Sequence, residues 1–125
     1  MTIKHAVHAA LGLALAFAAP ACHKADPAEK MVEMMEDLGN AADSANGDCA
    51  KLVAAVKPIV SKYQPDIAAM KAESEKMDKD KDAAKALQDK YSDRLTKAAP
   101  KMMKMLKCSD DAGFKAAMAP IDGMY

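Results

Sequence analysis

Stripes of apolar residues, spaced three and four positions apart, run along most of the chain and predict helices rather than strands. The first stripe covers about residues 27–45. It begins after Asp26 and Pro27, an N-cap followed by a proline at the first helical position. Asn46-Gly47 ends it. We expect its acidic side chains to face solvent; they are Glu29, Glu33, Glu36 and Asp37.

The second stripe covers about residues 48–77, with Asp48 as a suitable cap. It keeps its helical phase through Pro58 and Pro65, each of which removes a backbone hydrogen bond. One bent helix and two or three shorter helices both fit this pattern. Because the phase is unbroken, we favour the single bent helix.

A run of alternating acids and lysines, residues 78–82, separates the second stripe from a third. It contains no apolar residue, which is typical of an exposed turn. The third stripe crosses Pro100 and reaches Met102, Met105 and Leu106. A short fourth helix follows the cap at 109–111, with Phe114, Ala117, Met118 and Ile121 on its apolar face. The chain is therefore predicted to form an all-α domain. We expect a small antiparallel bundle of three to four helices with a long central helical hairpin.

Cys49 and Cys108 lie at equal distances in sequence from the charged run. If the second and third stripes form an antiparallel hairpin, the two cysteines face each other at its open end. A disulfide there closes a loop of about 60 residues, which contributes roughly 4 kcal/mol in the chain-entropy model. The alternative is a pair of free buried thiols.

Residues 1–21 have the parts of a secretory signal peptide. Lys4 gives a weakly basic start, residues 9–19 are uncharged and mostly apolar, and Ala19-Pro20-Ala21 has the small–x–small form of a cleavage site. The apolar run is shorter than the ~20 residues that a membrane-spanning helix needs. A buried first helix of the domain is the alternative.

The segment Ala19-Pro20-Ala21-Cys22 resembles the lipobox of bacterial lipoproteins. Ala21 and Cys22 match that motif, whereas Ala19 stands where leucine is usual and Pro20 is uncommon there. The resemblance implies that Cys22 is lipidated, becomes the first residue and anchors the protein in a bacterial envelope membrane, facing the periplasm. Lipidation also accounts for the odd cysteine in an exported chain.

This resemblance divides the chain into a signal peptide (1–21), a lipid-anchored leader (22–26) and a helical domain (27–125). Ordinary cleavage before Cys22 is the alternative, and it gives a soluble periplasmic or secreted protein. A Cys22 that pairs two copies of the chain, or stays unmodified, is also open.

Composition narrows the choice of function. Lys and Arg total 18, as do Asp and Glu, and this balance argues against nucleic acid as a partner. His23 is the only histidine after residue 21, so the helical domain offers no histidine to activate a serine or cysteine nucleophile. There is no Cys-x-x-Cys-His haem motif, and we expect no enzyme activity and no cofactor.

The remaining candidate metal-binding residues are methionines and aspartates. Met102, Met103 and Met105 are close enough in sequence to suggest a thioether site for Cu(I). Methionine on a core stripe more simply fills gaps in packing. Asp78, Asp80 and Asp82 resemble the start of a calcium loop, but Ala83 replaces its essential glycine.

We therefore expect a non-enzymatic envelope lipoprotein with a structural or protein-interaction role. Its expected partners are the membrane, through lipid on Cys22, and an unidentified envelope protein. The alternative is a periplasmic protein that binds a metal or a small ligand.

Overall fold

The computed structural model describes residues 26–124, which form helices joined by short turns and include no strand. The all-α class is confirmed. In chain order the elements are α1 (Pro27–Ala45), α2 (Cys49–Tyr63), the 3₁₀-helix η1 (Gln64–Asp66), α3 (Ile67–Lys79), α4 (Lys81–Met102), η2 (Met103–Cys108), α5 (Ala112–Met118) and η3 (Ala119–Ile121).

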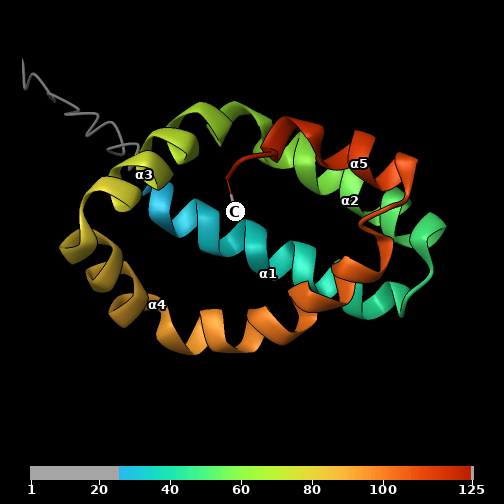
Figure 1. The fold of residues 1–125 in the computed structure, drawn as a ribbon, viewed down its shortest axis with the longest axis horizontal. Coiled ribbons are helices and arrows are strands. Elements are labelled where there is room, and N and C mark those ends of the chain that lie inside the picture. The colour runs from blue at the N-terminus through green and yellow to red at the C-terminus, as the bar shows by residue number, and fades with distance from the viewer. Residues whose placement is uncertain (1–25, 125) are drawn as a thin grey trace, which may run out of the picture.

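Helix α1 lies at the centre of the bundle (Figure 1). It contacts α2, α3, α4 and η2, whereas α3 and α4 meet near the turn between them. The predicted hairpin is therefore open: α2 and α3 form one arm, α4 and η2 form the other, and α1 fills the space between the arms. Its buried face carries Met34 and Leu38, both fully inaccessible to solvent.

The ends of α1 follow from local backbone chemistry. The Asp26 carboxylate accepts a hydrogen bond from the Ala28 amide at 3.1 Å, as an N-cap residue does. At the other end Asn46 is left-handed (φ 50°) and Gly47 has φ 86°. A left-handed residue after the last turn ends an α-helix and lets its amide satisfy a free carbonyl, here that of Ala42. Both ends lie where the sequence predicts them.

The prolines have different effects. Pro58 lies inside α2 and Pro100 lies inside α4, but a 3₁₀ turn at Pro65 separates α2 from α3. The prediction of one bent helix over 48–77 is therefore wrong at Pro65. A proline lacks the amide hydrogen and crowds the carbonyl four residues before it. All three prolines are on exposed faces, where water can solvate the carbonyl that loses its partner.

The 3₁₀-helix η2 changes which residues of the third stripe are buried. A 3₁₀-helix has three residues per turn, so positions i and i+3 lie in line. Met105 and Cys108 share the inner line, with exposed fractions of 6% and 1%. Met103 and Leu106 share an outer line and are 66% and 64% exposed. The expectation that Leu106 belongs to the core is therefore wrong, because it assumed the α-helical period.

The Cys49–Cys108 disulfide is present, with the two Cα atoms 5.5 Å apart. It joins the start of α2 to the end of η2, at the open end of the hairpin. At the other end, Asp80 both ends α3 and caps α4, where its carboxylate accepts hydrogen bonds from the amides of Asp82 and Ala83. The predicted pairing and the predicted turn at 78–82 are thus both found.

We predict that reduction of the disulfide lowers the thermal midpoint by roughly 15–30 °C, because a loop of this length contributes roughly 4 kcal/mol in the chain-entropy model. Helix content at room temperature should largely persist, since the apolar faces still pack. Circular dichroism melts of oxidised and reduced protein measure both quantities. A midpoint unchanged by reduction would contradict the role given to the disulfide.

The three-residue period of η2 predicts a large effect on stability at Met105 and a small effect at its neighbour Leu106. Met105→Ala should destabilise the protein by roughly 2–5 kcal/mol, because it empties a buried site. Leu106→Ala should change stability by about 0.5 kcal/mol or less, since an exposed side chain is removed. Urea unfolding of the two variants separates the cases. Equal losses at both positions would show that the segment is α-helical.

Candidate functional site

The site residues expected from sequence fall into three groups. Cys22, the expected lipidation site, lies outside the described residues. Cys49 and Cys108 form the disulfide. The three methionines proposed for Cu(I) have different surroundings: Met105 is buried, Met102 is half-buried, and Met103 is exposed. These different exposures do not favour a shared Cu(I) site on the three thioethers.

One edge of α4 is charged and the other is apolar. Side chains of the charged edge pair with α1. Arg94 makes two hydrogen bonds to the Glu36 carboxylate, with Nε–Oε1 2.9 Å and Nη2–Oε2 2.6 Å. Toward the C-terminal end of α4, Lys101 donates a hydrogen bond to Asn40 at 2.7 Å. In η2, Lys104 forms an ion pair with Asp43. Residue numbers rise together in these pairs, so α1 and α4 run parallel.

Helix α1 is also bonded to α2, on its other side. The Asp37 carboxylate accepts hydrogen bonds from Lys62 Nζ at 2.8 Å and from the Tyr63 hydroxyl at 2.7 Å. Burial raises the pKa of Asp37, but the hydrogen bonds from Lys62 and Tyr63 outweigh it and hold that pKa below its usual value. Burial, together with the hydrogen bond to Asp37, raises the pKa of Tyr63 to about 12.

The expectation that the acids of α1 face solvent is therefore wrong for Glu36 and Asp37, which are half-buried between helices. An apolar stripe identifies only the core-facing side of one isolated helix, so the pattern leaves every charged face to water. One signal in the sequence was available: Lys90, Arg94, Lys101 and Lys104 follow one another at spacings of four, seven and three residues, as basic residues on one edge of a helix do. Arg94, Lys101 and Lys104 hold α4 and η2 against α1 through these hydrogen bonds, so we assign the three side chains a structural role.

The other edge of α4 is apolar and partly open. A hollow of about 310 Å³ lies between α1 and α4, lined by Met35, Leu95, Ala98, Ala99 and Met102. Small side chains at 98 and 99 leave the space. Met103, one helical turn after Ala99, and Leu106 are the large apolar residues that are exposed in the described part of the chain. We call this hollow, together with Met103 and Leu106, the apolar surface.

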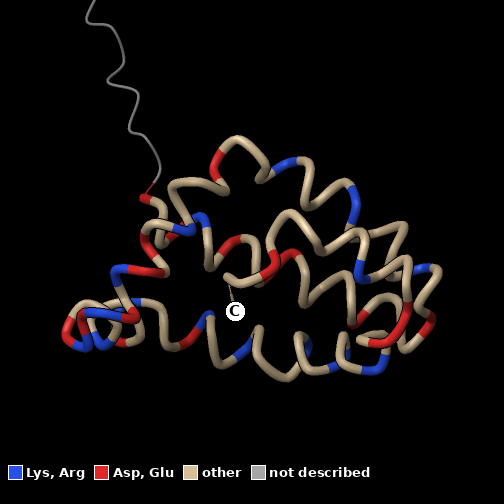
Figure 2. The backbone as a smooth tube through the Cα atoms, turned by 45° about the horizontal axis from the view of Figure 1, so that its top comes forward, with Lys and Arg blue, Asp and Glu red and all other residues tan. Residues whose placement is uncertain are grey.

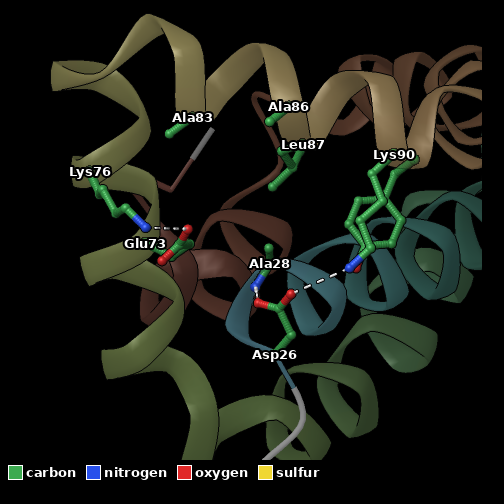
Figure 3. A pocket seen from close by; sticks show the side chains of 9 residues that line it. Asp26, Ala28, Glu73, Lys76, Ala83, Ala86, Leu87 and Lys90 are labelled. Carbon is green, nitrogen blue, oxygen red and sulfur yellow. Dashed lines mark hydrogen bonds and ion pairs between the residues drawn. The ribbon is translucent and has the colours of Figure 1, made fainter.

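A second hollow, of about 360 Å³, lies at the opposite end of the bundle and is charged (Figure 3). It is formed by the first turn of α1, the second half of α3 and the first half of α4. Charged side chains surround it, two acidic and two basic: Asp26, Glu73, Lys76 and Lys90. We call it the mixed-charge hollow. The nearby turn at 78–82 is dense in lysine and aspartate (Figure 2).

Two general features bear on what these surfaces do. Within residues 26–124, no three side chains of His, Cys, Asp or Glu come close enough together to hold a metal ion. No helix in that range is both long and apolar enough to cross a bilayer. Among the hollows of the described residues, the one in the apolar surface is lined by apolar side chains, and the mixed-charge hollow is surrounded by four charged ones.

The pairing of Glu36 with Arg94 predicts a pH-dependent contribution to stability. The hydrogen bonds from Arg94 lower the pKa of Glu36, so the pair stabilises the fold above the unfolded value of 4.5, and this stabilisation is lost as pH falls through the lowered pKa. We expect Arg94→Gln to lower the free energy of unfolding at pH 7, and to lower it progressively less toward pH 3.

Denaturant unfolding of wild type and variant across this pH range measures the difference. Lys97→Gln, at an exposed position on the same helix, is the matched control and should have little effect at any pH. A difference between wild type and Arg94→Gln that stays constant from pH 7 to pH 3 would contradict the role of the carboxylate.

Comparison with protein-family models, curated proteins and solved structures found no match to this chain. A function must therefore be inferred from the N-terminal sequence and from the geometry of the described residues.

Proposed function

We propose that this protein is a non-enzymatic lipoprotein of the bacterial cell envelope, anchored through lipid on Cys22, whose helical domain binds another envelope protein through the apolar surface. The observation that carries the interaction role is the exposure of Met103 and Leu106 beside an apolar hollow. The lipobox-like residues before Cys22 support the anchor.

An anchor at Cys22 and the apolar surface would lie at opposite ends of the domain. Asp26 lies only a few residues after Cys22 in the sequence, and α1 starts immediately after it. The 19 residues of α1 extend roughly 28 Å toward the end that the disulfide closes. Met103 and Leu106 belong to η2, the element that ends at this disulfide. An anchor at Cys22 thus leaves them at the remote end of the domain.

The chemistry of the apolar surface favours a protein partner with an apolar side chain. Methionine is flexible and polarisable, so Met35, Met102 and Met103 can adapt to a ligand's shape. Three exposed residues in the preceding turns on the same edge of α4 are uncharged: Gln88, Ser92 and Thr96. A buried apolar side chain in a pocket, surrounded by uncharged contacts, is the usual centre of a protein interface.

The anchor predicts that wild-type protein sediments with membranes and incorporates a palmitate analogue in bacterial cells. Cys22→Ala should abolish labelling and leave either uncleaved precursor or soluble protein, because the acceptor thiol is gone. Gel fluorescence and fractionation measure both. Cys49→Ala with Cys108→Ala should still be labelled, as a control for nonspecific thiol acylation. Unlabelled wild type in the soluble fraction would refute the anchor.

The interaction role predicts a site-specific crosslink in cells. A photoreactive amino acid at Met103 should give one discrete adduct, and one at Lys57, which is exposed on α2, should not. Ala99→Lys, which places a charge in the hollow, should abolish the adduct while leaving the thermal midpoint near that of wild type. An adduct that is insensitive to Ala99→Lys, or equally strong at Lys57, would exclude the apolar surface as the binding site.

A further inference from the structure

Methionine supplies the oxidisable sulfur of the described domain. Cys49 and Cys108 are bonded to each other, so residues 26–124 contain no free thiol, and the chain contains no tryptophan. The methionine thioether is therefore the group in this range that a two-electron oxidant attacks first. How fast each methionine reacts depends on how far its side chain is exposed to solvent.

The methionines of this range differ widely in exposure. Five are buried, with exposed fractions of 6% or less: Met31, Met34, Met70, Met105 and Met124. Four are half-buried: Met35, Met77, Met102 and Met118. Met103 is 66% exposed. It lies only two residues before Met105 in η2, but the two side chains follow different lines of that 3₁₀-helix, so one faces solvent and the other faces the core.

Met103 belongs to the apolar surface, together with Leu106 and the hollow that Met35 and Met102 line. Addition of one oxygen turns the flexible, apolar methionine side chain into a polar sulfoxide. At position 103 water can hydrogen-bond the new oxygen, so the fold should tolerate it. At Met105 the same oxygen would be buried without a partner, which is costly.

We propose that Met103 is a reversible oxidation site that changes the apolar surface from apolar to polar. The sulfur lone pair attacks one oxygen of hydrogen peroxide, and a sulfur–oxygen bond forms as the oxygen–oxygen bond breaks. The sulfur loses two electrons, and the second oxygen takes the proton of the transferred hydroxyl and leaves as water. A sulfoxide reductase reverses the change: it takes two electrons and two protons from a dithiol, which becomes a disulfide, and releases the added oxygen as water.

The consequence for binding rests on the proposed function, in which an apolar side chain of a partner docks on this surface. A sulfoxide at Met103 should weaken that docking, because its oxygen would lose water and gain no hydrogen bond. Oxidation of Met103 itself depends on no partner. The two statements can therefore be tested separately.

Peptide mass spectrometry of the purified mature protein, treated with graded hydrogen peroxide, measures the order of oxidation. Met103 should react first, roughly tenfold faster than Met105, in line with their exposed fractions of 66% and 6%. At the dose that oxidises Met103, the thermal midpoint should stay near that of untreated protein. Methionine sulfoxide reductases should then remove the added oxygen. Equal rates at Met103 and Met105, loss of the fold at that dose, or a sulfoxide that the reductases cannot remove would overturn the site.

A photoreactive amino acid at Leu106 measures the consequence in cells. Peroxide should lower the yield of its adduct several-fold when residue 103 is methionine. In the Met103→Leu background the yield should stay at its own untreated value, because leucine keeps the apolar side chain and has no sulfur. A yield that peroxide leaves unchanged in both backgrounds, or lowers equally in both, would refute the effect on binding. No adduct in untreated cells would contradict the proposed function, and the effect on binding with it, while the peptide spectra still decide whether Met103 is the oxidation site.

Discussion

The position of α1 between the two arms of the hairpin is the constraint on which the rest of the structure depends. Elements α2 through η2 form an arch that the turn at Asp80 closes at one end and the disulfide closes at the other. A small domain with few aromatic residues has limited apolar surface to bury. Placing a helix inside a cross-linked arch lets that one helix contribute to the interfaces with both arms, while α5 adds its buried side chains to the core from the side of α2.

This central placement also explains why α1 carries so many acids. Its core face packs against the inside of the arch, and its flanks must lie against the lysine and arginine side chains of both arms. The Glu36–Arg94 pair fixes α1 to α4, and the Asp37–Lys62–Tyr63 cluster fixes it to α2. Close approach to α4 requires Gly39, where an added Cβ would lie 3.2 Å from Lys101 Cβ and 3.3 Å from the Ala98 carbonyl oxygen. Polar pairs at the flanks thus set the register, and apolar packing supplies most of the stability.

The mixed-charge hollow and the apolar surface lie at opposite ends of this one scaffold. The mixed-charge hollow lies where α1 begins, and the exposed residues of the apolar surface lie on the element that ends at the disulfide. In the proposed function, the anchor at Cys22 and the apolar surface therefore belong to opposite ends of the domain. The charged side chains of Glu36 and Asp37 hold α1 against α4 and α2.

The sequence alone determined the features that depend on near neighbours in the chain. Asp26 and Asn46-Gly47 bound α1 because capping needs only a side chain or a left-handed residue within one turn. The charged run at 78–82 set the turn, and its equal spacing from Cys49 and Cys108 predicted the disulfide. Tertiary structure decided the break at Pro65 and the exposure of Leu106, since the choice between α and 3₁₀ geometry depends on which side chains must reach the core. It also decided that Glu36 meets Arg94 and that the Tyr91 hydroxyl is buried, because those contacts join residues brought together only when α1 packs inside the arch.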